Sequence, residues 1–153
     1  LQGEINYVRP YTYQHREGLG SYSHHRAPLA HPLGANFIEA VGIVRYNYKR
    51  WHADLRLSYA EVGYDTSDSN WGQNVFLSYN TREQDFDNKV GQGLNTKIIW
   101  AEVNINYLIN PNYRMNGFFN IGMRRFEQPT KTTSTVLIQA GIRTNLFNRY
   151  YDF

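Results

Sequence analysis

The chain has 153 residues, a length typical of one domain, and its mean hydropathy is −0.62 although aromatic residues make up 16% of it. Many aromatic residues in a polar chain are typical of strands with one apolar and one polar face, and they argue against disorder. The net charge of +3 is small and the basic residues are dispersed, which excludes a nucleic-acid-binding patch. Because cysteine is absent, disulfides, thiolate catalysis and cysteine metal sites are excluded as well.

No stretch approaches the roughly 20 apolar residues that a transmembrane helix needs, so any membrane crossing would have to use strands. Residues Leu1 to Glu4 already alternate like a strand and lack the charged start and apolar core of a signal peptide. We therefore expect a mature chain or a fragment, and the missing lead-in favours a fragment.

Six segments alternate apolar and polar residues with a period of two, which predicts β-strands. The first runs from Gln2 to about Tyr13 and is interrupted by Pro10. The others, in chain order, are Ile38 to Lys49, Trp51 to Tyr59, Ile99 to Tyr107, Met115 to Arg124 and Val136 to Leu146. Helices are excluded because the apolar residues do not recur every three or four positions.

Long and short connections alternate between these strands. The long ones span about residues 16–36 and 64–94, the tight turns are residues 49–50 and 110–113, and an intermediate one runs from Glu127 to Thr132. Bacterial outer-membrane barrels have short periplasmic turns and long outer loops. This alternation of long and short connections places the C-terminus in the periplasm and the long loops outside the cell.

Aromatic residues cluster where the surface of a membrane would lie. They flank the two tight turns and close the chain: Tyr46, Tyr48, Trp51, Tyr107, Tyr113, Phe147, Tyr150, Tyr151 and Phe153. A terminal Phe after an amphipathic strand also resembles the C-terminal signal that outer-membrane proteins present to their assembly machinery.

The predicted fold class is therefore all-β: an antiparallel transmembrane β-barrel of the bacterial outer membrane, with residues 1–153 as a single barrel segment. Closed bacterial barrels begin at about eight strands, so six strands predict the C-terminal portion of a larger barrel. A further hairpin near Val75 to Asn80 is an alternative source of strands. The alternative architecture is a soluble antiparallel sandwich or a lipocalin-like barrel.

Several short segments carry a resemblance to a known family. They are Tyr11-Thr12-Tyr13-Gln14-His15, His31-Pro32-Leu33-Gly34-Ala35-Asn36, Asn70-Trp71-Gly72-Gln73-Asn74, Gln92-Gly93, Ile109-Asn110-Pro111 and Arg143-Thr144-Asn145-Leu146-Phe147. Together they resemble the C-terminal part of the Wzi-like capsule-assembly barrels, and more closely the Bacteroidota branch of RemB-type gliding-motility proteins. The resemblance implies a barrel of well over a dozen strands, with capsular polysaccharide or surface motility as the context. It transfers no sugar-binding residue.

Charged residues on the polar faces of the strands are predicted to point into the lumen. They are Glu39, Arg45, Asp54, Arg56, Glu102, Arg124 and Arg143. Opposite charges on neighbouring strands can pair across a sheet. Two interpretations remain open, a channel whose selectivity these charges tune and a lumen filled with ion pairs.

The long loops are rich in residues that stack on sugars and hydrogen-bond their hydroxyls. The candidate ligand-binding residues are Tyr11, Tyr13, Tyr22, His31, Asn36, Trp71 and Asn74.

Other candidate chemistry is weaker. The loop histidines His15, His24, His25 and His31 match no zinc spacing, and Asp65, Asp68, Asp85 and Asp87 do not have the spacing of an EF-hand. No serine motif accompanies His52, so an outer-membrane lipase is not indicated. We expect no metal, no cofactor and no enzymatic activity.

The predicted function is a non-enzymatic outer-membrane barrel that binds surface polysaccharide or organises the cell surface. The expected partners are membrane lipid, surface polysaccharide and other outer-membrane proteins. The alternatives are a structural subunit of a multi-protein outer-membrane complex for secretion, motility or assembly, and a passive channel.

Overall fold

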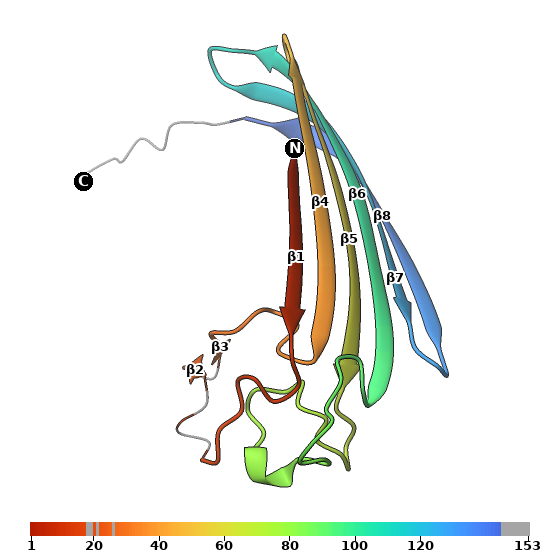
Figure 1. Ribbon diagram of the computed structural model, residues 1–153. Coiled ribbons are helices and arrows are strands. Elements are labelled where there is room, and N and C mark those ends of the chain that lie inside the picture. Colours follow the sequence, from red (N-terminus) through yellow and green to blue (C-terminus); the bar gives the residue numbers. More distant parts are fainter. Residues whose placement is uncertain (18–19, 21, 26, 145–153) are drawn as a thin grey trace, which may run out of the picture.

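A computed structural model describes residues 1–17, 20, 22–25 and 27–144, and its main feature is one antiparallel sheet (Figure 1). Its six strands are β1 (Gln2–Val8), β4 (Phe37–Tyr48), β5 (Trp51–Tyr64), β6 (Leu94–Asn110), β7 (Met115–Glu127) and β8 (Thr132–Arg143). They lie side by side in chain order, each paired with the next. This confirms the all-β, antiparallel, six-stranded prediction, and the sheet is open, with β1 and β8 at its edges.

The long loops contain short elements of secondary structure. Strands β2 (Ser23–His24) and β3 (Ala27–Pro28) pair with each other in the first loop, and a 3₁₀ turn, η2 (Tyr79–Thr81), lies in the second. Among the described residues, no helix is long and apolar enough to cross a membrane.

The register of the strands places residues of similar polarity opposite one another across the sheet. One continuous cross-strand row is Val44, Leu55, Val103, Ile121 and Ile138. The next row along the strands, which points to the opposite face, is Arg45, Asp54, Asn104, Asn120 and Gln139. Because successive side chains of a strand point to opposite faces, the sheet has one apolar and one polar face over its central part.

The long connections gather at one end of the sheet and the tight turns at the other (Figure 1). The long loops are residues 9–36 and 65–93, and the tight turns are residues 49–50 and 111–114. The turn of residues 128–131, between β7 and β8, lies at the same end as the long loops. The terminal aromatic residues, Phe147, Tyr150, Tyr151 and Phe153, lie outside the described residues.

Strand β1 is shorter than predicted: it ends at Val8, not near Tyr13. Pro10 lies in a turn, and Tyr11 adopts a left-handed backbone conformation with φ of 62°. An L-residue with such a φ breaks the extended conformation, so the chain leaves the sheet there and enters the first loop.

Strand β5 extends to Tyr64, five residues beyond the predicted end at Tyr59. The prediction stopped there because the alternation of apolar and polar residues changes after Tyr59. There the side chains on the polar face become apolar, with Ala60 and Val62, and Glu61 lies on the apolar face. Residues 75–80 form no strand; within the described part of that loop the only bridges are Thr66 to Ser69 and Asn70 to Arg82.

A small core forms where the loops cover the sheet. Phe37, Ala60 and Val62 are buried there, and the residues packed against them are Val8, Leu33, Tyr64 and Ile98. Leu33 belongs to the first loop, whereas the others come from strands. Phe37 lies on the same face as Glu39, so the loop packs on the polar side of the sheet, at its loop end.

Replacing Phe37 by Ala should destabilise this core by ~3–5 kcal/mol, since a fully buried aromatic side chain leaves a cavity. Guanidinium unfolding and hydrogen exchange at the ends of β4 and β5 measure the loss. Phe86→Ala is the matched control, because the side chain of Phe86 is 83% exposed and should contribute little. Equal effects of the two variants would contradict the location of the core.

Candidate functional site

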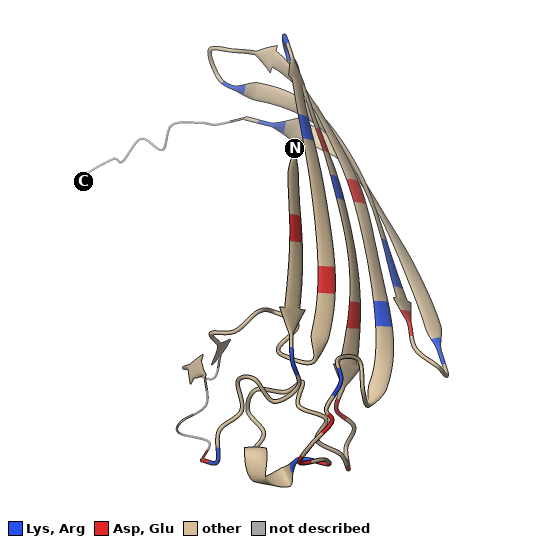
Figure 2. Ribbon diagram, in the orientation of Figure 1, with Lys and Arg blue, Asp and Glu red and all other residues tan. Residues whose placement is uncertain are grey.

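The seven charged residues predicted to share a face do so. The strand register places Glu39, Arg45, Asp54, Arg56, Glu102, Arg124 and Arg143 on the polar face. Figure 2 shows the charged bands distributed along the strands, with acidic and basic residues interleaved.

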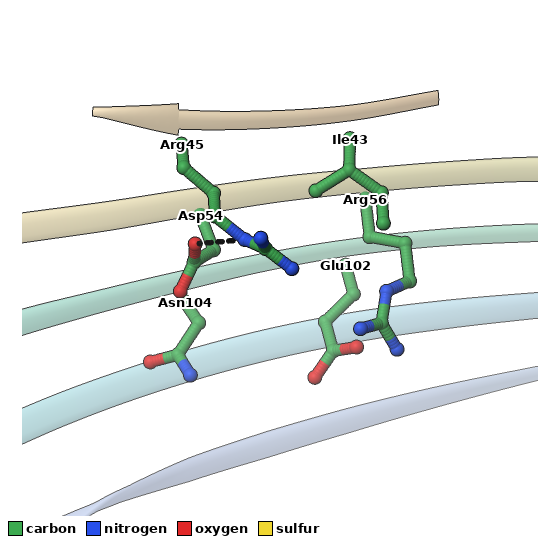
Figure 3. A pocket seen from close by; sticks show the side chains of 6 residues that line it. All are labelled: Ile43, Arg45, Asp54, Arg56, Glu102 and Asn104. Carbon is green, nitrogen blue, oxygen red and sulfur yellow. Dashed lines mark ion pairs between the residues drawn. The ribbon is translucent and has the colours of Figure 1, made fainter. Parts of the chain in front are cut away.

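At the centre of this face the charges form a network around a hollow (Figure 3). Arg45 Nε lies 3.6 Å from Asp54 Oδ1, and Arg56 and Glu102 occupy directly opposite positions on β5 and β6. Asn120 Nδ2 donates to Glu102 Oε1 at 2.7 Å. Opposite charges thus lie across from one another on neighbouring strands, and Arg45 and Asp54 form an ion pair, which lowers the cost of placing them on one face.

His52 belongs to the same network. Its Nε2 lies 2.9 Å from Asp54 Oδ2, and its Nδ1 contacts Asn47 Oδ1. Both ring nitrogens are therefore engaged by a carboxylate and an amide rather than by a serine hydroxyl, the contact that a nucleophilic triad requires.

Two arginines of the polar face lie over aromatic rings. Arg124 lies 5.6 Å from the ring centre of Phe126, and Arg143 lies 5.1 Å from that of Phe118. Phe118 also covers Gly141 directly opposite on β8, where an added Cβ would meet its ring at 3.0 Å. These cation–π contacts hold the two guanidinium groups against the sheet.

His31 connects the first loop to the polar face. Its Nε2 lies 3.1 Å from Glu39 Oε2, and its ring stacks on Phe37 at 4.6 Å between ring centres. Glu39 also accepts a hydrogen bond from Asn6 Nδ2 at 3.1 Å. The loop thus lies on the polar face through both a polar and an aromatic contact.

Asn36 joins the two long loops to the strand ends. Its Nδ2 lies within hydrogen-bonding distance of the carbonyl oxygens of Gly63 (2.7 Å), Trp71 (3.2 Å) and Gln92 (2.9 Å). Its Oδ1 accepts from the Gly91 amide at 2.8 Å. The residue is completely buried, with φ of 58°, a conformation that Asn tolerates better than most residues.

Tyr11 and Asn70 join the loops a second time. The Tyr11 hydroxyl donates to the Asn70 carbonyl at 2.8 Å, and burial raises the pKa of this phenol, which keeps it a donor. Gln14 and Asn70 exchange hydrogen bonds through their side-chain amides, at 2.9 and 3.2 Å. Gly72 packs so closely on Tyr11 that a Cβ would come within 2.4 Å of its backbone nitrogen.

Asp65 orders the segment that contains Trp71 and Asn74. Its carboxylate accepts from the backbone amides of Trp71, Gln73 and Asn74, at 2.5, 3.4 and 2.8 Å. The sequence indicates Asp65 only as a calcium ligand, and it indicates no framework role for Gln14 or Asn70. The Asn-Trp-Gly sequence is a signal that could have indicated the role of Asn70, because it favours a turn in which Asn70 Oδ1 accepts from the Gly72 amide.

The candidate ligand-binding residues therefore fall into three groups: buried residues, partly covered residues and a stacked pair of tyrosines. Tyr11 and Asn36 are buried framework residues, and Trp71, Asn74 and His31 are partly covered. Tyr22 is 50% exposed and stacks on Tyr13, with ring centres 5.6 Å apart.

The second loop forms a polar hollow of about 240 Å³. Its lining is Thr66, Ser67, Asp68, Ser69, Asn70, Leu77, Thr81 and Glu83. Hydroxyls, carboxylates and one apolar side chain are a lining suited to a polyhydroxyl ligand.

Metal ligands do not converge in the part of the chain that the structure describes: no three His, Asp or Glu side chains there could hold one ion. His24 and His25 contact each other, with ring centres 4.1 Å apart, and His31 faces Glu39.

Comparisons of the chain with protein-family models, with curated proteins and with solved structures found no match.

Replacing Asn36 by Ala should open both loops, because the carbonyls of Gly63, Trp71 and Gln92 and the Gly91 amide lose their partner together. Each buried polar group left without a partner costs ~1–3 kcal/mol. Limited proteolysis should then cut the loops much faster than in the unaltered protein. Asn80→Ala, at an exposed position of the same loop system, should change nothing; equal cleavage of the two variants would refute the role of Asn36.

Proposed function

We propose that this chain is part of a non-enzymatic transmembrane β-barrel of the bacterial outer membrane, whose loops bind surface polysaccharide. The observation that carries the proposal is the apolar face of the sheet, which nothing in the described chain covers. Its side chains stay exposed across all six strands, for example Ile5, Tyr46, Leu57, Ile105, Phe119 and Ile138. Soluble monomers rarely expose an apolar surface that is so continuous.

The boundaries of this face have the character of a membrane interface. Toward the tight turns it ends in aromatic residues, where Trp51 and Tyr107 lie directly opposite with ring centres 4.8 Å apart. Toward the loops it ends in a charged row, Glu61, Lys97 and Glu127. Between these limits β5 contributes nine residues, Trp51 to Tyr59. A tilted strand needs about 9–11 residues to cross a bilayer.

The polar face supports the same orientation. Its centre carries a network of charges and amides, and the first loop packs onto it through His31 and Leu33. Such a face suits a water-filled or plugged interior better than the dry interface of a two-sheet sandwich. The packed loops favour a plugged interior over an open channel.

In the described chain the sheet has two edge strands, β1 and β8, each with one unpaired edge, so a closed barrel needs further strands. Backbone amides and carbonyls cannot remain unpaired in hydrocarbon, so further strands must pair with the free edges of β1 and β8. The proposed barrel is accordingly larger than these six strands, which agrees with the architecture that the Wzi-like resemblance implies.

Polysaccharide binding is the function that the loops support. The stacked pair of Tyr13 and Tyr22 offers an aromatic surface to a sugar ring, and the hollow beside Asn70 offers hydroxyls and carboxylates. The buried contacts of Asn36 and Tyr11 hold this surface in one conformation, which lowers the entropic cost of binding.

A charge placed on the apolar face should impair membrane insertion. Leu55→Arg or Ile105→Arg should cost ~2–4 kcal/mol near the middle of the bilayer, whereas Arg56→Leu, on the polar face, should not. Folding into lipid vesicles, followed by heat-modifiable gel migration, measures the effect. Equal tolerance of substitutions on both faces would show that the assignment of inside and outside is wrong.

Removing the exposed ring of the aromatic pair should weaken polysaccharide binding without loss of the fold. Tyr22→Ala should lower retention of surface polysaccharide by roughly two- to tenfold, since stacking of a ring contributes about 0.5–1.5 kcal/mol. Phe86→Ala, which removes an exposed loop ring far along the chain from this pair, is the control. Unchanged retention by the Tyr22 variant would exclude this pair as the binding surface.

A further inference from the structure

The tight-turn end of the sheet is basic, whereas at the opposite end an acidic second loop is balanced by a basic first loop and by Lys131. The tight turns, residues 49–50 and 111–114, contain three basic residues, Lys49, Arg50 and Arg114, and no acidic one. The second loop, at the other end, contains five acidic residues, Asp65, Asp68, Glu83, Asp85 and Asp87, against two basic ones, Arg82 and Lys89. Figure 2 shows the basic end beside the tight turns.

An apolar groove of about 430 Å³ runs along the apolar face next to this basic end. It exists because Gly117 has no side chain between its neighbours Tyr107 on β6 and Ile142 on β8. Trp51, Ile109 and Phe119 complete its walls. The groove is therefore a break in an otherwise continuous apolar surface, open toward the aromatic boundary.

The groove and the basic turn are in direct contact. Arg50 Nη1 lies 3.5 Å from the Ile109 carbonyl, and the Arg50 carbonyl accepts from the Leu108 amide at 2.8 Å. The side chain of Ile109 in turn comes within 3.6 Å of the position that a Cβ of Gly117 would take. A cationic group thus lies beside this shallow apolar groove, with Arg114 in the adjacent turn.

We propose that this end of the sheet binds one anionic phospholipid, with an acyl chain in the Gly117 groove and the phosphate between Arg50 and Arg114. The inference rests on the proposed membrane function and names a lipid that the membrane supplies. The charge of the turns determines the choice of occupant. An apolar peptide would use the groove but not the arginines, and a soluble anion would use the arginines but not the groove.

The headgroup contact is tested with the full-length protein and vesicles of phosphatidylcholine alone or mixed with phosphatidylglycerol. The unaltered protein should bind the mixed vesicles more tightly. In the double variant Arg50→Gln/Arg114→Gln, the preference for the mixed vesicles should fall about fivefold for each charge removed. The control double variant, Arg125→Gln/Lys131→Gln, removes the same charge at the loop end and should keep the preference.

The acyl-chain contact is tested with two glycines of the apolar face. Gly117→Leu fills the groove and should abolish the phosphatidylglycerol that native mass spectrometry finds retained on the detergent-extracted protein. Gly42→Leu adds the same side chain on β4, where nothing lies within 4 Å of a Cβ, and should leave the retained lipid unchanged.

Three outcomes overturn the phospholipid site while the membrane function stands: equal binding to both kinds of vesicle, equal loss in the two arginine-to-glutamine pairs, and retained phosphatidylglycerol in the Gly117 variant. Failure of the unaltered protein to enter either vesicle, measured separately by protection from protease, overturns both proposals.

Discussion

The antiparallel hydrogen-bond ladder that joins the six strands of the sheet, with one register shift between Leu108 and Asn110, is the constraint on which everything else depends. It aligns Val44 with four apolar residues on the neighbouring strands and Arg45, one position later, with a row of polar ones. Because side chains alternate with a period of two, a slip of one residue in any strand would exchange its two faces. Both the exposed apolar face and the charged network exist only in this register.

The loops are held to the sheet by buried amides rather than by a large core. The core at the loop end is small, whereas Asn36 alone contacts four backbone groups from three segments. Loop backbone that is packed against a sheet needs partners for its amides and carbonyls, and Asn offers both a donor and an acceptor. This explains why two proposed ligand residues, Tyr11 and Asn36, are framework residues, and why the recognition surface shifts to Tyr13, Tyr22 and the hollow near Asn70.

The basic tight turns give the proposed barrel a direction. The hydroxyls and carboxylates of the second loop suit contact with hydrated polymers, while the basic turns and the Gly117 groove suit the phosphate and acyl chain of a phospholipid. Trp51 and Tyr107, which line the groove, would then lie at the membrane surface, where amphipathic rings are most stable. The two proposed binding surfaces share no residues.

By itself, the sequence determined the strands, their order and the face of each charged residue, because period-two alternation is a local property that each segment carries alone. Local reasoning misplaced the ends of several strands, above all at Pro10 and Tyr11, where the chain turns away, and beyond Tyr59, where loops cover the polar face. It also made the strands Leu94–Asn110 and Met115–Glu127 too short. Only the tertiary structure decided which loop residues are buried. Asn36 meets Gln92 across 56 positions and Gln14 meets Asn70 across the same separation. No periodicity links residues that far apart, since their contact follows from how two long loops fold over a sheet that must form first.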